Sequence, residues 1–305
     1  MPSAGALFVF EAAARHENFT RAAEELNVTQ PAVSRTLASL EGFLGTNLFL
    51  RKRPGAMLSE DGKILRAAVS DAFSGIENAL RRIEERKTGK VTITLSVSTA
   101  FTTHWLMPRI SRFHAAFPQI DLRFQLIAGP LSGPIDDVDL AMRFVDPGSS
   151  RGRFVMHEAY VPLCAPDYFE RSLPRGPTLI RLENMAAADL QKLLAAEHRD
   201  FDEDLAFSDY SVVVQAALVG QGIASGWLNV AAYWLAEGRL VPATGTLVRP
   251  GRDCRLLTGR TGAPDWAVDS VARWIADEIA GDIRAAATLY PDLGLERVLN
   301  DGGSA

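Results

Sequence analysis

Three polar side chains gather at the start of one amphipathic segment, "QPAVSRTLASLE" (residues 30–41). Gln30 brings an amide, Ser34 a hydroxyl and Arg35 a guanidinium. Helical spacing turns the apolar residues of the segment to the opposite side: Val33, Leu37 and Leu40. An amide suits adenine, a guanidinium suits guanine or a phosphate, and a hydroxyl can reach either. The segment therefore predicts contact with DNA base edges, with a surface helix of a small helical packing unit as the alternative.

A second group of polar side chains lies in "SVSTAFTTHW" (residues 96–105). It supplies four neighbouring hydroxyls: Ser98, Thr99, Thr102 and Thr103. The run passes from the end of a predicted strand to the start of a predicted helix, where free N–H groups and the helix dipole favour an anion. The pattern predicts an anion site, although Thr102 or Thr103 can also serve only to cap the helix.

Other kinds of site lack their residue patterns. The five histidines show no metal-ligand spacing such as H-E-x-x-H, and the sequence has no G-x-S-x-G, Walker or G-x-G-x-x-G motif. Cys164 and Cys254 are too few for a disulfide framework. The apolar surroundings of Cys164 favour a buried, inert thiol over a redox switch. We therefore predict no catalytic residue, no metal site and no cofactor, and the chain is not expected to be an enzyme.

The composition is typical of a globular protein. The 305 residues suffice for two or three domains, and 47% are hydrophobic and 23% charged. No apolar run approaches the roughly 18 residues of a membrane span, and no signal-peptide pattern opens the chain, so a cytoplasmic protein is expected. Residues 1–90 hold 13 Lys/Arg against 11 Asp/Glu, whereas residues 91–305 hold 19 against 26. A locally basic N-terminal face can therefore bind DNA on a molecule of net charge −5.

A small helical domain must position the DNA-contacting residues. Patterning predicts helices at 7–15, 21–26 and 30–42, with Thr20 as the N-cap of the second. "NVT" joins the second helix to the third, and alanines at 22–23 allow a close approach. This arrangement is a helix-turn-helix, whose second helix enters a major groove. A basic loop follows it.

One long helix is predicted next, over residues 59–87. Its apolar positions step by four and three residues: Leu65, Val69, Ala72, Ile76, Ala79 and Ile83. This 3.5-residue repeat is the spacing of a coiled-coil seam, and the alternative is one face of an ordinary amphipathic helix. We expect the helix to pair two copies of the chain.

From residue 91 the pattern becomes α/β. Alternation at 91–98 and 120–126 predicts two strands, and "WLMPRISRFHAAF" between them predicts a helix, which together make a βαβ unit. Further strands are expected in "DVDLAMRF", "YVPLCAP", "LIRL", "GIASGW" and "CRLLTG", and helices near 211–219 and 266–280. Glycine- and proline-rich joints permit two lobes.

The N-terminal part also carries a set of short pieces in a fixed order: "FTRAAEELNVTQPAVSR", "LE" (40–41), "LG" (44–45), "LF" (48–49), Arg51 and "LSEDG" (58–62). With these pieces, residues 7–65 closely resemble the winged helix-turn-helix domain of LysR-type transcriptional regulators. Members usually carry "LTEAG" or similar where this chain has "LSEDG", so Asp61 adds a charge near the phosphates.

This resemblance implies a DNA-contacting segment from Phe19 to Ala38. The residues expected to matter most are Thr29, Gln30, Ser34 and Arg35, with Arg51 and Arg53 in the wing. It also implies double-stranded promoter DNA as a partner, with RNA polymerase as a further one.

The downstream part resembles the effector-binding domain of the same family, particularly the branch of glycine-cleavage and β-lactamase activators. The matching pieces are "WLMPRISRFHAAFPQIDL", "DVDLAMRF", "VPLCAPDYF", "QAALVGQGIASG" and "GRLVP". The resemblance implies two α/β lobes with a cleft that binds a small molecule. Segment 181–206 lacks the tryptophans expected there, which leaves the contour of the second lobe open. The expected effector contacts are Thr99, Thr102, Thr103, Arg143, Ser208 and Trp227.

These observations predict a multi-domain α+β protein. Its parts are a winged helix-turn-helix domain (1–58), a linker and dimerisation helix (59–88), a two-lobed α/β domain of the periplasmic-binding-protein type (91–285) and a frayed tail (286–305). The predicted function is a sequence-specific transcriptional regulator, homodimeric or homotetrameric, controlled by an anionic or amino-acid-like effector. A cytoplasmic solute-binding protein and a redox-sensing regulator in the same fold are the alternatives. The effector, the target genes and the choice between activation and repression stay open.

Overall fold

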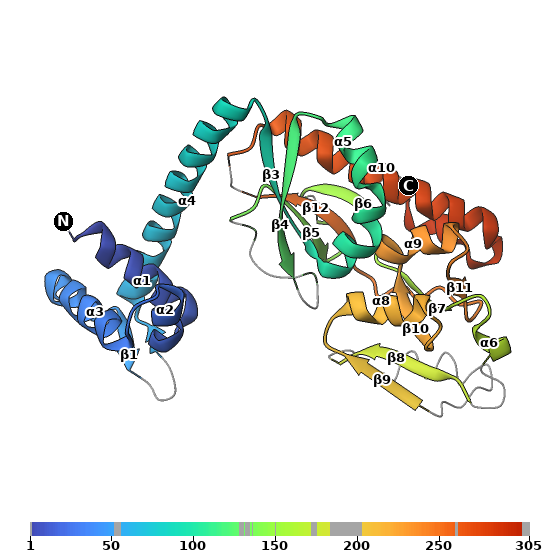
Figure 1. Cartoon of the computed structure of the whole chain (residues 1–305), viewed down its shortest axis with the longest axis horizontal. Coiled ribbons are helices and arrows are strands. Elements are labelled where there is room, and N and C mark those ends of the chain that lie inside the picture. The colour runs from blue at the N-terminus through green and yellow to red at the C-terminus, as the bar shows by residue number, and fades with distance from the viewer. Residues whose placement is uncertain are drawn as a thin grey trace. The chain divides into compact units, whose positions relative to one another are not determined.

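The computed structural model describes residues 2–51, 56–127, 131, 135, 137–149, 151–171, 176–183, 203–259 and 262–300. The chain divides into two compact units, Met1–Glu84 and Glu85–Ala305. The first unit is mainly helical and the second is α/β (Figure 1). This is the multi-domain α+β class that the sequence predicts.

The first unit begins with three helices, α1 (Ala4–His16), α2 (Phe19–Glu25) and α3 (Gln30–Leu44). The prediction that Thr20 caps α2 is wrong. The cap is Asn18, whose side-chain oxygen accepts the backbone N–H groups of Thr20 and Arg21 at 2.9 and 3.2 Å. Asn18 can do this because its backbone is extended, as an N-cap requires, whereas Thr20 already lies inside the helix.

Small and large apolar residues build the core of the first unit. Ala22 and Ala23 of α2 are buried, so α2 packs closely against its neighbours. The wing hairpin consists of β1 (Phe49–Arg51) and β2 (Ala56–Leu58). Glu41 of α3 anchors it, because one carboxylate oxygen accepts the N–H groups of Leu48 and Phe49 at 2.7 and 3.2 Å.

Helix α4 (Glu60–Thr88) contains the predicted seam, but the seam has two different environments. Leu65 and Val69 pack into the core of the first unit. Ile76 and Ile83 are more than half exposed, as is Leu80, which lies between them. Within this chain, the first part of the seam stabilises the helix-turn-helix domain and only the second part is free for a partner.

The second unit contains two five-stranded sheets. The first has the order β4-β3-β5-β12-β6, with these bounds: β3 (Val91–Ser98), β4 (Ile120–Ile127), β5 (Leu140–Val145), β6 (Arg153–His157) and β12 (Asp253–Thr258). Strands β3 and β4 are parallel, as the predicted βαβ unit requires. Three helical segments connect them: the π-helix η1 (Phe101–Leu106), the 3-10 turn η2 (Met107–Arg109) and α5 (Ile110–Ala116).

The second sheet has the order β11-β7-β10-β8-β9. Its strands are β7 (Tyr160–Cys164), β8 (Thr178–Leu182), β9 (Glu203–Phe207), β10 (Ile223–Trp227) and β11 (Val241–Pro242). Its helices are α6 (Tyr168–Arg171), α8 (Tyr210–Leu218) and α9 (Leu228–Ala236). Helix α9 packs against η1 and against the long helix α10 (Asp265–Leu289), so one apolar core joins both sheets (Figure 1).

The C-terminal segment is not the frayed tail that the sequence predicts, at least as far as residue 300. Helix α10 runs to Leu289, and two 3-10 turns follow, η3 (Pro291–Leu293) and η4 (Leu295–Val298). Leu295 and Val298 are fully buried. A few large aliphatic residues secure the segment despite its weak pattern, while residues 301–305 lie outside the described part. None of the described helices combines the length and the apolarity that a bilayer span needs.

Candidate DNA interface and effector site

The first turn of α3 presents the side chains that the sequence assigns to DNA. Gln30 and Arg35 are exposed and Ser34 is half-buried, while the opposite face of the helix is buried in the core. Thr29 precedes the helix without capping it through its side chain, and Pro31 occupies the first turn. The helix therefore begins with an exposed hydroxyl next to an exposed amide, at the end that a helix-turn-helix directs toward base edges.

These polar side chains also contact their own helix. The Gln30 amide nitrogen donates to the Ser34 hydroxyl at 2.9 Å. Arg35 Nε donates to the carbonyl of Pro31 at 3.3 Å, and the side chain is exposed. Both side chains are thereby held along the helix surface before any ligand binds.

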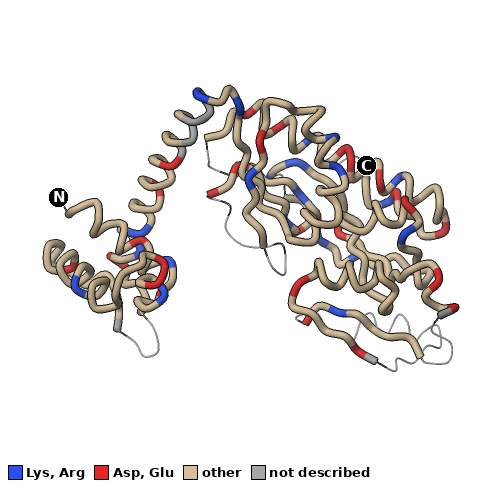
Figure 2. Tube along the Cα trace, in the orientation of Figure 1, with Lys and Arg blue, Asp and Glu red and all other residues tan. Residues whose placement is uncertain are grey.

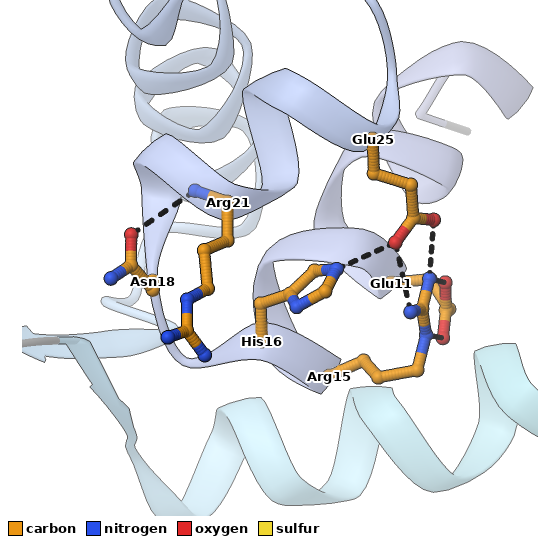
Figure 3. Close-up of polar contacts among 6 residues, drawn as sticks. All are labelled: Glu11, Arg15, His16, Asn18, Arg21 and Glu25. Carbon is orange, nitrogen blue, oxygen red and sulfur yellow. Dashed lines mark hydrogen bonds and ion pairs between the residues drawn. The ribbon is translucent and has the colours of Figure 1, made fainter.

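A cluster of charged side chains fixes α2 against α1 (Figure 3). Arg15 donates to both carboxylate oxygens of Glu25, at 2.9 and 2.6 Å, and also to Glu11. His16 lies 2.6 Å from Glu25. The Arg15 guanidinium, helped by His16, lowers the pKa of Glu25 to about 2. This cluster was not among the predicted features, and its one signal in the sequence is the Glu11–Arg15 pair at helical spacing.

The sequence also assigns two arginines near the wing hairpin to DNA, Arg51 and Arg53. Arg51 ends β1 and faces Ala56 across the hairpin, and Arg53 lies outside the described residues. Asp61, expected near the phosphates, accepts a hydrogen bond from Thr46 at 2.6 Å. Charged residues of both signs lie on the helices of the first unit (Figure 2), and α3 itself carries one of each sign, Arg35 and Glu41.

The hydroxyls after β3 are partly engaged in local hydrogen bonds. The Ser98 hydroxyl accepts the N–H of Phe101 at 3.1 Å, and the Thr102 hydroxyl donates to the carbonyl of Ser98 at 3.3 Å. Thr99 is half-buried and Thr103 is exposed. The helix then opens into the wide π turn, in which the N–H of Met107 bonds to the carbonyl of Thr102. Such turns are frequent at functional sites.

Arg143 lies beneath this end of the sheet. Ser96 of β3 pairs with Ala141 of the parallel strand β5. Arg143 comes two residues after Ala141, and Ser98 comes two residues after Ser96, so both lie toward the same end of the sheet. The Arg143 guanidinium donates to the Ser96 hydroxyl at 2.9 Å and to the Met142 carbonyl at 2.9 Å. Arg143 is buried, and burial lowers the pKa of its side chain. The structure thus brings Arg143 to the same sheet end as Ser98 and Thr99.

The two residues expected from the second lobe have different surroundings. Ser208 is exposed and directly precedes Asp209, the N-cap of α8. The indole N–H of Trp227 donates to the buried carboxylate of Glu158 at 3.1 Å. Arg252 also binds Glu158, at 2.7 and 2.8 Å. The indole N–H of Trp227 is therefore used inside the protein, where the chain crosses between the two sheets. Only the face of its ring can contact a ligand.

Two polar residues at the junction of the sheets were not among the predicted site residues. His104 of η1 lies 2.9 Å from the carbonyl of Ser211 at the start of α8, and burial lowers the pKa of this histidine. Asn229 of α9 is 2% exposed, and its nitrogen reaches only the sulfur of Met142, at 3.6 Å. Its oxygen has no partner among the described residues. Neither contact has a signal in the sequence, because each joins elements far apart in the chain.

Two cavities formed by described residues lie away from this site. One of about 700 Å³ is lined by residues of β6, β12 and α10, including Arg153, Arg255 and Asp269. Another of about 470 Å³ lies between residues 241–245 and 289–293. Neither lining includes a predicted effector residue. Cys164 and Cys254 are both buried, and burial raises the pKa of Cys254, so neither presents the exposed thiol that a redox sensor uses.

Comparison with known proteins gives these two units a family. Residues 5–63 match the bacterial regulatory helix-turn-helix proteins of the lysR family, and residues 86–280 match the LysR substrate binding domain. The glycine cleavage system transcriptional activator of Escherichia coli K12 is 37% identical over 252 residues, which cover 79% of this chain and 82% of that protein. The transcriptional activator AmpR of Rhodobacter capsulatus is 32% identical over 286 residues, covering 90% and 96%.

A solved structure agrees at the level of the fold. The crystal structure of ArgP from Mycobacterium tuberculosis superposes with a TM-score of 0.53 at 18% identity, covering 90% of this chain and 98% of that one. The family matches span both units, and the relatives named above are transcriptional regulators. The chain belongs to the LysR family of bacterial regulators: it is a DNA-binding transcriptional regulator with an effector-binding domain.

Proposed function

We propose that the first turn of α3 reads promoter DNA directly, with Gln30 on adenine and Arg35 on guanine or a phosphate. The observation that carries this is the exposed polar edge formed by Gln30, Ser34 and Arg35 above an apolar, buried underside. Thr29, with its uncapped helix end, and the wing residues Arg51 and Arg53 would hold phosphates. The protein would act in the cytoplasm with RNA polymerase and has no enzymatic role.

The test uses a duplex selected by the wild-type chain from a randomised library. Gln30→Ala or Arg35→Ala should weaken binding to that duplex by about 1–3 kcal/mol and relax the base preference at one position. Ser39→Ala, an exposed hydroxyl loss farther along α3, is the matched control and should leave both unchanged. If Arg35→Ala and the control bind selected and random duplexes alike, α3 does not read sequence.

We also propose that the exposed part of the seam on α4 pairs two copies of the chain. Ile76 and Ile83 of the predicted seam are each more than half exposed, as is Leu80, which is adjacent to the seam position Ala79. Ile76→Asp would place a charge between two apolar helices, so it should turn a dimer or tetramer into monomers in sedimentation at tens of micromolar. Glu77→Ala, one position off the seam, should leave the oligomer intact. A wild-type chain that is already monomeric would refute the pairing.

For the effector, we propose a small carboxylate or amino-acid-like anion at the end of β3. Thr99 and Thr102 stand at this helix start, and the buried guanidinium of Arg143 is bonded to Ser96 of β3, two residues before Ser98. A positive charge near this strand end favours an anion. Thr103, Ser208 and the ring of Trp227 would complete the contacts from the rim and the second lobe. Binding would shift the lobes and change transcription without altering α3.

Calorimetry of the full chain against carboxylic acids, amino acids and their neutral amides tests this proposal. An acid should bind best, and Thr99→Val should weaken it by roughly 10-fold or more, because a hydrogen bond to a charged group is lost. Thr102→Val should cost less, because the Thr102 hydroxyl already donates to the Ser98 carbonyl. Thr103→Val is the matched comparison, and we expect the smaller effect there because Thr103 is exposed. A neutral amide binding as tightly as its acid would place the site elsewhere.

A further inference from the structure

Gln30 and Ser34 are bonded to each other across one turn of α3. The Gln30 amide nitrogen donates to the Ser34 oxygen at 2.9 Å, and the two residues are four positions apart on the exposed edge. Ser34 is half-buried between Gln30 and the underside of the helix, whereas Gln30 is exposed. The hydroxyl that the sequence offers as a base contact is therefore already the acceptor of a neighbouring side chain.

The chemistry of the amide gives this bond a consequence. A glutamine amide has one oxygen acceptor and two N–H donors. A bidentate contact with adenine uses the oxygen for the N6 amino group and one N–H for N7. The second N–H is left over, and it is this donor that Ser34 can accept without competing with the base.

The bond also settles which way the amide faces. The terminal torsion of glutamine is broad and roughly two-fold, so a free amide samples both orientations. Only one of them presents oxygen and N–H in the order that adenine requires. Anchoring one N–H on Ser34 fixes the plane of the amide and leaves the remaining N–H and the oxygen available to a base, because Gln30 is exposed. A group ordered before binding loses less entropy when the contact forms.

We infer that Ser34 is a positioning residue that orients the Gln30 amide for adenine, and that it does not itself read a base. This rests on the proposed readout by α3. Arg35 needs no equivalent helper, because its planar guanidinium is a rigid fork and its Nε is held on the Pro31 carbonyl at 3.3 Å. The two side chains thus reach the same pre-ordered state by different means.

A double-mutant cycle on the full chain tests the inference. The probe is the duplex that the wild-type chain selects from a randomised library, and the variants are Gln30→Ala, Ser34→Ala and both together. Ser34→Ala should weaken binding to this duplex by about 2- to 10-fold, in keeping with one neutral hydrogen bond. In the Gln30→Ala background the same change should have no effect. Affinity for random duplexes and the salt dependence should stay as in wild type.

Two controls separate positioning from damage to the helix. Ser39→Ala removes another hydroxyl of α3, on an exposed residue beyond the DNA-contacting segment, and it should change neither affinity nor base preference. Replacing the contacted adenine by 7-deazaadenine removes N7, and Ser34→Ala should then cost nothing further. Thermal unfolding of each variant shows that the fold is retained.

Each contrary result has a distinct meaning. If Ser34→Ala weakens binding equally with and without Gln30, Ser34 touches DNA itself and the inference is wrong while the readout by α3 stands. If Gln30→Ala changes nothing, the readout by Gln30 fails and the inference fails with it. If the selected base is guanine and Ser34→Ala relaxes that preference, the amide faces the opposite way and its assignment to adenine is overturned.

Discussion

The helix-turn-helix domain and the effector domain use polar side chains in opposite ways. In the first, Gln30 and Arg35 project from a single helix into solvent and bond only within that helix. In the second, Arg143 and Glu158 are almost fully buried and bond to neighbouring strands and loops. A surface that meets a long duplex can be built from one helix, whereas a small ligand must be surrounded, so its contacts come from several elements. Substitutions should therefore act locally in the first domain and spread in the second.

The strongest test removes one partner of a buried charge in the effector domain. Arg252→Ala leaves the Glu158 carboxylate, 1% exposed, without its cation and should lower the free energy of unfolding by about 3 kcal/mol. The loss should lie at the low end for a broken buried ion pair because Arg252 is 47% exposed. Glu158→Gln should cost less, because a neutral amide can still accept from Trp227. All five tryptophans lie beyond residue 91, so tryptophan fluorescence in urea reports this domain alone.

Arg249→Ala supplies the control, since it removes an exposed arginine three residues away. Equal losses for Arg252→Ala and Arg249→Ala would mean that the buried cluster is no more sensitive than the surface. The contrast between the two domains would then be wrong.

In the helix-turn-helix domain the largest effect should come from backbone crowding and not from charge. A Cβ at Gly62 would lie 2.1 Å from the backbone oxygen of Leu48, where the wing begins, so the chain must shift. Gly62→Ala should cost about 1–3 kcal/mol and weaken DNA binding. Gly42→Ala, where a Cβ would meet nothing within 4 Å, should instead be neutral or slightly stabilising. Far-UV circular dichroism follows the urea unfolding of both domains, whereas tryptophan fluorescence follows only the effector domain, so the comparison isolates the helix-turn-helix domain. Equal unfolding midpoints of this domain in both variants would contradict the steric argument.

The two domains should also lose stability in different pH ranges. Burial lowers the pKa of His104, which faces Ser211, the ring of Trp234 and the charge of Asp209. The unfolded chain therefore takes up a proton first, and stability is lost as the pH falls below about 6.5, by at most about 1.4 kcal/mol per pH unit. The urea unfolding midpoints, followed by tryptophan fluorescence between pH 7.5 and 5.5, measure this loss of stability. His104→Gln should flatten the dependence and exposed His114→Gln should not; an unchanged slope in His104→Gln would reject the assignment.

The smallest effect should appear in the charged cluster of the helix-turn-helix domain. The pKa of Glu25 is lowered from 4.5 to about 2, first by Arg15 and then by His16. Its contribution is therefore present above about pH 4.5 and lost as the pH falls toward 2. The groups are largely solvated, so it should stay under about 1 kcal/mol. Acid unfolding followed by far-UV circular dichroism should be less pH-dependent in Glu25→Gln than in Glu24→Gln; the reverse order would show that the cluster adds nothing.

Local patterns in the sequence determined the helix-turn-helix domain. Helical spacing alone places Val33, Leu37 and Leu40 on one face, which packs into the core. The exposure of Gln30 and Arg35 on the other face could therefore be predicted without knowledge of any other element. The same reasoning located β3, β4 and the helical segment between them, because strand alternation and helical spacing are local as well. Local patterns did not predict α9. They also did not predict β6 and β9, which are short edge strands whose boundaries depend on partners distant in the chain.

Tertiary structure decided what the buried polar residues do. The sequence offered Trp227 and Thr102 as ligand contacts, but the fold brings Glu158 to the indole N–H and Ser98 to the Thr102 hydroxyl. It also divided the seam of α4, burying Val69 in its own domain and leaving Ile76 exposed. The physical reason is that burial and hydrogen-bond pairing depend on which segments meet in space. A pattern read along one segment cannot contain that information, whereas the period of a helix already fixes which side chains share a face.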